Sequence, residues 1–350
     1  MKNTIIRGSF ETLYFSGMHH MMRPLVGGIG VILTLHHVRP PRSGDFQPNR
    51  LLEVSPDFFE VVLKRLRRSR RDLISLDEMH RRLLSGDSTR RFVCVTFDDG
   101  YRDVLEHAYP LLRKYEVPFT LYIPTSFPDR LGELWWIGLE QVIAKNTRIG
   151  LTIDGEERLF KCGTTREKWA LYNQLYGWLR SMTSEAELRR VVRDLAARHG
   201  VDMPAFCRDL CMDWVELGQI AADPLCTIGA HTVNHVMLKK LPTDQAVRAE
   251  TDMSRTVIEA ALNIRPQHLA YPIGDPTSAG PREFRIVTEL GFKTAVTTRP
   301  GVIFREHREH LTALPRISVN GDFQSQRYLK VLLSGAATGL WNGFRRVNAA

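Results

Sequence analysis

The stretch Thr96-Phe97-Asp98-Asp99-Gly100 decides the fold class of this chain. It follows the apolar run of residues 92–95, which predicts a buried strand. In α/β folds the carboxyl ends of the strands carry the reactive groups. Adjacent carboxylates repel each other and point to opposite faces of a strand, so we expect Asp98 and Asp99 to have separate tasks, such as moving a proton and binding a metal. Asp-Asp-Gly also occurs in ordinary turns, and the stretch alone leaves that interpretation open.

A second motif, His231-Thr232-Val233-Asn234-His235, follows another apolar run at residues 226–230. Two histidines four residues apart face the same way if the chain turns into a helix there. Neutral imidazole is a ligand for zinc, cobalt, nickel and iron. With Asp99, the two histidines would give three protein ligands and one open position, as in a catalytic metal site. Surface helices carry the same spacing by chance, and either histidine could instead bond to the backbone.

The two motifs in this order resemble those of the polysaccharide deacetylases, carbohydrate esterase family 4, which includes the nodulation-type chitooligosaccharide deacetylases. Ala270-Tyr271-Pro272-Ile273-Gly274 is similar to the Tyr-Pro-x-Gly third motif of one branch, and Leu314-Pro315-Arg316-Ile317 to a late motif of that branch. The resemblance covers roughly residues 30–330. It implies an α/β fold, an irregular barrel of seven β/α units.

The resemblance also implies a role for each matching residue. Asp99, His231 and His235 would hold a divalent metal, zinc or else cobalt, nickel or iron. Asp98 would be the general base for a metal-bound water that attacks the acetyl carbonyl, and the backbone N–H of Ile273 would help to stabilise the oxyanion. The implied reaction removes N-acetyl groups from N-acetylated amino sugars in an oligosaccharide or polysaccharide.

The chain departs from the better-known members of the family in the third motif. They carry an arginine there that orients the catalytic aspartate, whereas this chain has Ala270. Arg316 is the candidate replacement, because a permanently charged guanidinium would keep Asp98 ionised. The alternative for Arg316 is an ion pair at the surface.

The proton donor is the second departure. Most members use a late histidine, and no convincing equivalent follows residue 320. The run of residues 30–35 ends instead in His36-His37, which resembles the motif that opens a circularly permuted branch. His36, with His37 as runner-up, is therefore the predicted general acid for the leaving amine, and His307 and His310 are weaker candidates.

Strand-like runs separated by helical patterns predict a parallel barrel. They lie near residues 31–35, 92–97, 119–123, 226–230, 268–271, 293–297 and 314–319. We expect a helical leader at 1–28 with a helix from Ser9 to Met22, a barrel at 29–330, a helical insertion at about 130–215, and a tail at 331–350. In the insertion, a turn is expected at Asp154-Gly155. The pair Trp135-Trp136 would either stack on sugar rings or anchor the insertion to the barrel.

The 350-residue chain has the composition of a soluble globular protein, with 43% hydrophobic and 25% charged residues. Its five cysteines are an odd number, which suits a reducing cytosol better than a disulfide framework. No secretory signal pattern is evident, and the apolar stretch at 25–35 is too short to span a bilayer. We therefore expect a cytoplasmic protein.

The formal charge is +9, and the strongest run of cations lies at residues 64–71. It continues a helix predicted to start at Ser55-Pro56. A solvated outer helix face is the plain interpretation, and peripheral docking to a membrane surface or an acidic glycan is the functional one. No nucleic-acid-binding motif accompanies the charge, so we expect no nucleic acid partner.

Two other functions stay open at this stage. The same fold also hosts hydrolases of other C–N amide bonds, including cyclic ureides, and the motifs do not separate these from deacetylases. The changed third motif and the displaced general acid also leave room for a catalytically idle barrel that binds a glycan.

Overall fold

The computed structural model describes residues 2–153 and 155–349. Seven parallel strands form its centre, in the order β1-β12-β11-β10-β9-β6-β5. β1 also pairs in parallel with β5, from Gly30 opposite Phe92 to Leu35 opposite Phe97, and this pairing closes the barrel. The predicted seven-stranded α/β barrel is confirmed. The barrel strands are β1 (Gly30–Leu35), β5 (Phe92–Phe97), β6 (Phe119–Ile123), β9 (Cys226–Ala230), β10 (His268–Ala270), β11 (Thr294–Pro300) and β12 (Leu314–Ser318).

The strands are apolar along their length because both of their faces are covered. Every residue of β1, β5 and β6 is buried. In parallel sheets with two covered faces, the strand sequences are near-continuous apolar runs. Ile32, Cys94 and Val296 belong to a cluster inside the barrel, and the opposite faces pack against the surrounding helices. Three further short strands are β2 (His37–Val38), β3 (Glu53–Val54) and β4 (Asp72–Leu73).

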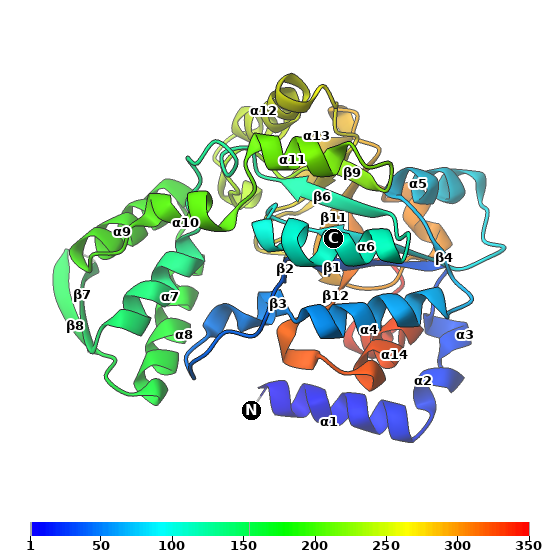
Figure 1. The fold of residues 1–350 in the computed structure, drawn as a ribbon, viewed down its shortest axis with the longest axis horizontal. Coiled ribbons are helices and arrows are strands. Elements are labelled where there is room, and N and C mark those ends of the chain that lie inside the picture. Colours follow the sequence, from blue (N-terminus) through cyan, green and yellow to red (C-terminus); the bar gives the residue numbers. More distant parts are fainter. Residues whose placement is uncertain (1, 154, 350) are drawn as a thin grey trace.

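Helices surround the barrel (Figure 1). The Ser55 side chain accepts the Phe58 N–H at the start of α4, and Thr243 accepts the Ala246 N–H at the start of α12. Such caps satisfy N–H groups that have no partner within the helix. These outer helices are α4 (Pro56–Arg67), α5 (Leu76–Ser85), α6 (Tyr109–Lys114), α11 (Trp214–Ala221), α12 (Asp244–Leu262) and α13 (Pro281–Glu289).

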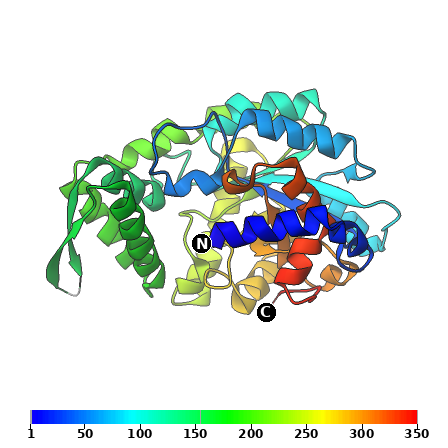
Figure 2. The ribbon, with the colours of Figure 1, turned by 90° about the horizontal axis from the view of Figure 1, so that it is seen from below.

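The insertion projects to one side of the barrel (Figures 1 and 2). Its hairpin pairs Ile153 with Glu156, and the predicted turn falls partly on Asp154, which lies outside the described residues. The first helix of the insertion packs against the next two. The elements are α7 (Trp135–Lys145), β7 (Arg148–Ile153), β8 (Glu156–Lys161), α8 (Thr165–Ser181), α9 (Glu185–Arg198) and α10 (Met203–Leu210).

The N-terminal helix α1 packs against the C-terminal helix α14 through Phe10, Leu13 and Val331. The single helix predicted from Ser9 to Met22 is wrong, because Gly17 has φ 72° and separates two helices. The predicted start of the tail, between residues 330 and 331, falls inside α14. These terminal elements are α1 (Lys2–Phe15), α2 (Met18–Met21), α3 (Arg23–Val26), α14 (Gln326–Ser334) and α15 (Ala336–Trp341). Within the described ranges, none of the helices combines the length and the apolar character that a membrane crossing requires.

Candidate active site and metal centre

The carboxyl ends of the barrel strands bring together side chains from distant parts of the sequence. Asp98 and Asp99 follow β5, His36 follows β1, and His231 follows β9. Because all seven strands are parallel, these ends meet at one mouth of the barrel. Arg316 reaches the same place from within β12.

Asp99, His231 and His235 form a compact buried group at this mouth. Oδ1 of Asp99 lies 3.6 Å from Nε2 of His231 and 3.3 Å from Nε2 of His235. The three potential ligand atoms all lie within 4.8 Å of one another. Nδ1 of His231 donates to the Ala270 carbonyl at 2.7 Å, which leaves the lone pair of its Nε2 facing the carboxylate. Two imidazoles and one carboxylate thus converge on one point.

The donor set fits a divalent cation. Oδ1 of Asp99 is buried and has no hydrogen-bond partner among the described residues. Burial, together with the charge of Asp98, raises the pKa of Asp99 to about 8. A buried carboxylate oxygen without a partner is costly, and a cation between Oδ1 and the two histidines would offset that cost. The arrangement therefore suits zinc or a similar transition metal.

The histidine motif adopts a conformation that the sequence reasoning did not predict. Residues 231–235 form an irregular loop, so the helix considered for this motif is wrong. Thr232 and His235 have φ values of 66° and 53°, and Asp99 has 71°. Left-handed backbone is uncommon for residues other than glycine, above all for a β-branched threonine, and tends to occur at functional sites. The loop, and not a helical face, turns both imidazoles toward Asp99.

Two residues that the sequence analysis missed hold this loop. Glu250 of α12 accepts hydrogen bonds from the backbone N–H groups of Val233 and Asn234 at 3.1 and 2.9 Å. Arg189 of the insertion donates to the Asn234 carbonyl at 2.6 Å. Both contacts join distant segments, and no local pattern marks either residue.

Asp98 lies in a different environment from its neighbour. Both of its oxygens accept hydrogen bonds from the Arg316 guanidinium, at 2.7 and 2.6 Å. Nε of Arg316 donates to the Thr297 carbonyl, and the side chain is fully buried. Burial alone would raise the pKa of Asp98, but the charge and hydrogen bonds of Arg316 outweigh it and hold that pKa well below its usual range. The surface ion pair considered for Arg316 is therefore wrong.

The structure separates the two histidines proposed as proton donors. Nε2 of His36 lies 3.9 Å from Oδ2 of Asp98, and the His36 side chain is 20% exposed. Burial lowers the pKa of His36 to about 4. His37 instead pairs with Asp103 at 2.6 Å and stacks on Tyr101. Only His36 of this pair is brought beside Asp98.

The two weaker candidates are not part of this mouth. His307 and His310 precede β12, and the nearby Ile303 bridges to Gly30 at the start of β1. These histidines therefore lie toward the amino ends of the strands, at the opposite end of the barrel from Asp98.

The third motif forms a strained turn after β10. Ile273 has φ 63°, which is a genuine outlier for a β-branched residue. The Gly274 N–H donates to the Pro272 carbonyl at 2.6 Å, and the Thr298 hydroxyl donates to the Ile273 carbonyl at 2.6 Å. The Ile273 N–H has no acceptor among the described residues and is free to donate to a ligand.

A cavity of about 320 Å³ lies between the barrel mouth and the insertion. His37 and Trp136 are among the residues that line it. The ring of Trp136 lies 4.9 Å from the ring of His235, whereas Trp135 stacks on Tyr176 within the insertion. Trp135 therefore packs inside the insertion, and Trp136 connects the cavity to the group of Asp99, His231 and His235.

Comparison with known proteins agrees with this architecture. The model of the polysaccharide deacetylase family matches residues 85–152 and 177–295, more than half of the chain. The chain belongs to the polysaccharide deacetylase family, whose members are hydrolases that act on carbon–nitrogen bonds. A search of curated protein sequences finds no match.

Several solved structures share the fold. The Streptococcus pyogenes deacetylase PplD, in complex with acetate, has 18% identity and a TM-score of 0.55, over 86% of this chain and 97% of that chain. IcaB from Ammonifex degensii has 18% identity and a TM-score of 0.54, over 88% and 98%. A de-N-acetylase from Aggregatibacter actinomycetemcomitans has 12% identity and a TM-score of 0.55, over 87% and 99%. At these identities the likeness concerns the fold.

Proposed function

We propose that the protein is a metal-dependent N-deacetylase that releases acetate from N-acetylated amino sugars in an oligosaccharide or polysaccharide, including chitooligosaccharides. The observation that carries this proposal is the buried group of Asp99, His231 and His235 directly beside the Asp98–Arg316 pair. It combines a metal-ligand set with a fixed, ionised carboxylate at the open end of a barrel.

Asp99, His231 and His235 would hold the metal, which is zinc or else cobalt, nickel or iron. When bound, such an ion supplies a Lewis acid for the acetyl carbonyl and for the attacking water. The hydrogen bond from His231 to the Ala270 carbonyl fixes the ring orientation that the ligand role requires.

Asp98 would act as the general base. Arg316 keeps the carboxylate ionised and fixes both oxygens in place. Oδ2 of Asp98, which would accept the proton, lies 3.9 Å from Nε2 of His36. With a pKa of about 4, His36 is neutral near pH 7 and must take up a proton before it can donate one to the leaving amine. The protonated Asp98 would be a source of that proton.

Ile273 and Trp136 would contact the substrate. The free N–H of Ile273 would donate to the oxygen of the acetyl group as negative charge develops there. The cavity beside Trp136 offers space for part of the glycan, with the indole as an apolar contact for a sugar ring.

Acetate release from N-acetylglucosamine oligomers by metal-loaded protein tests the proposal. We expect the wild type to release acetate, the Asp98→Asn variant to keep its metal while releasing acetate about 10²- to 10⁴-fold more slowly, and the His231→Ala variant to lose both. A wild type that binds metal and releases no acetate would contradict the proposal. Release of a different product from another amide would assign the site to a related amidohydrolase.

The sequence-based division into leader, barrel, insertion and tail stays a prediction, as does the cytoplasmic location. All five cysteines are free thiols, which is usual in a reducing compartment. Fractionation of cells that express the native gene tests the location, and recovery from the periplasm or the medium would contradict it.

A further inference from the structure

A small cavity of about 60 Å³ lies far from the metal-binding group, between the N-terminal helices, the end of α4, and α14. Two of the residues that line it are Leu333 and Ser334, and none of the lining residues carries a carboxylate. The other residues that line it are all basic: His19, His20, Arg23, Arg65, Arg71 and Lys330. A volume of this size has room for several water molecules and therefore admits a single phosphate group.

The cations around this cavity lack acidic partners. Within the described ranges, no ion pair joins Arg23, Arg65, Arg71 or Lys330 to a carboxylate, whereas Arg81 and other arginines do pair. Burial and the charges of the neighbouring arginines lower the pKa of Arg71 to about 10, as expected for cations that repel one another.

One buried donor at the cavity has no acceptor. Nε of Arg23 is buried and has no hydrogen-bond partner among the described residues. His19 is only 3% exposed, and its Nδ1 donates to the Leu13 carbonyl, which fixes the ring in the lining. Buried donors are normally satisfied, so the Arg23 nitrogen indicates a site for an anionic acceptor.

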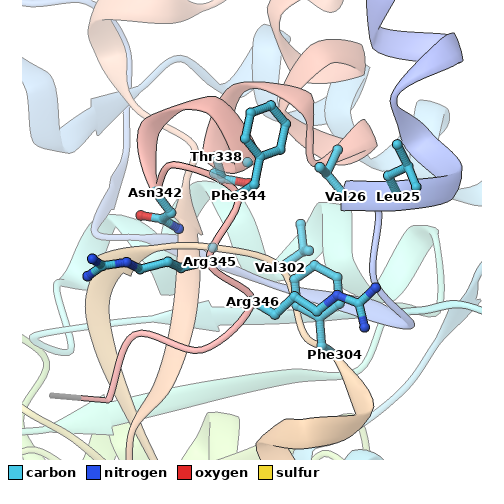
Figure 3. Close-up of a pocket in the computed structure, with 11 residues that line it drawn as sticks. Leu25, Val26, Val302, Phe304, Thr338, Asn342, Phe344, Arg345 and Arg346 are labelled. Carbon is cyan, nitrogen blue, oxygen red and sulfur yellow. The ribbon is translucent and has the colours of Figure 1, made fainter.

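Exposed apolar side chains lie next to two of these basic residues along the chain. Met21 is 76% exposed and Leu25 is 71% exposed, and they alternate along α2 and α3 with His20 and Arg23. Figure 3 shows that the C-terminal segment with Phe344 lies beside α3, where Phe344 and Leu25 line a common cavity. Interleaved apolar and cationic side chains are typical of segments that lie in a membrane interface.

We propose that this face docks on an anionic lipid bilayer, with the headgroup phosphate of one lipid in the cationic cavity and the apolar side chains in the interface. Guanidinium groups match phosphate oxygens in geometry and charge. The apolar surround favours a lipid over a free phosphate ion as the occupant, because a dissolved ion would leave those side chains in water.

The proposed docking face lies at the opposite end of the barrel from the active site. Arg71 directly precedes β4, whose Asp72 pairs with Phe92, the first residue of β5. Asp98 and Asp99 follow the other end of β5. Docking therefore leaves the barrel mouth accessible, and this inference can fail or hold independently of the proposed deacetylase activity.

Co-sedimentation of the full chain with lipid vesicles tests the proposal. We expect binding to vesicles of phosphatidylcholine with phosphatidylglycerol, and little binding to phosphatidylcholine alone. The double variant Arg23→Gln, Arg71→Gln should weaken binding about 25-fold, since each basic residue near an anionic surface contributes roughly fivefold. If that variant does not fold, the pair Arg65→Gln, Lys330→Gln replaces it, because Arg65 is exposed and Lys330 only partly buried.

Matched control variants distinguish binding at this cavity from non-specific attraction by the positive charge of the protein. Arg166→Gln with Arg190→Gln removes the same charge from exposed positions of the insertion and should change vesicle binding little. Met21→Ser with Leu25→Ser should weaken binding, whereas Leu131→Ser with Val215→Ser, at similarly exposed positions, should not. Acetate release should be unchanged in all of these variants.

Three results would overturn the proposal. If the cationic variant and its charge control lose vesicle binding equally, the binding is non-specific electrostatic attraction. Equal binding to neutral and anionic vesicles would remove the role of the cations. Binding of inorganic phosphate at this cavity without any vesicle binding would assign it to a soluble anion and not to a membrane.

Discussion

The two neighbouring carboxylates at the barrel mouth, Asp98 and Asp99, lie in opposite environments. On the β12 side, Arg316 satisfies both oxygens of Asp98 and holds its pKa low. On the side of the 231–235 loop, Oδ1 of Asp99 faces two imidazole nitrogens without a hydrogen-bond partner, and its pKa is raised to about 8. Both oxygens of Asp98 have partners, whereas the surroundings of Asp99 fit the cation that we propose there. Two adjacent aspartates thus differ in pKa because different side chains surround them.

The largest expected effect is on the Asp99 side. His231→Ala removes one of three predicted ligands, so metal content and acetate release should both fall to background. Metal analysis of the purified variant checks this, with His310→Ala as a control that should keep both. Retained metal in the His231 variant would contradict the assigned ligand set.

On the Asp98 side, the expected effect is on stability. Arg316→Met would leave a buried carboxylate without a partner and should lower the free energy of unfolding by about 3–5 kcal/mol. Chemical denaturation measures this. The double variant with Asp98→Asn should recover part of the loss, because the uncompensated charge is gone. A double variant no more stable than the single one would indicate that Arg316 acts through packing alone.

A smaller effect is expected at the support of the histidine loop. Glu250→Gln weakens the acceptor for the loop N–H groups and should lower metal affinity about 10- to 100-fold. Losses of this size are typical when a residue that supports the metal ligands through hydrogen bonds is changed. A competition titration with a chelating dye measures the affinity. Glu259→Gln, on the same helix but paired with Arg265, should leave it unchanged.

The smallest effect is expected at the cavity. Trp136→Phe keeps an aromatic ring but loses part of its face, so KM for oligosaccharides should rise about 2- to 10-fold with kcat nearly constant. Steady-state kinetics on oligomers check this, beside Trp135→Phe, which should leave KM unchanged. Equal effects in the two variants would favour an anchoring role for both residues.

Much of this arrangement could be predicted from local sequence patterns. The barrel strands are apolar runs because both of their faces are covered, and the site residues follow these runs directly. The motif order then indicated which of these residues meet. The terminal helix boundary at Gly17 was missed, although a glycine in the left-handed region commonly ends a helix.

The parts that could not be predicted depend on distant contacts. The left-handed conformations of Thr232 and His235 carry no glycine or proline signal. They are held by Glu250, from a helix later in the chain, and by Arg189, from the insertion. The bidentate contact of Arg316 with Asp98 spans more than two hundred residues, so the sequence indicated the partner but not its burial.

The most direct test of the division between the two carboxylates compares Asp98→Asn with Asp99→Asn in metal content and acetate release. We predict that Asp98→Asn binds metal as the wild type does while acetate release falls about 10²- to 10⁴-fold, as expected for loss of a general base. Asp99→Asn should lose both. Equal metal loss in the two variants, or full activity of Asp98→Asn, would contradict the account.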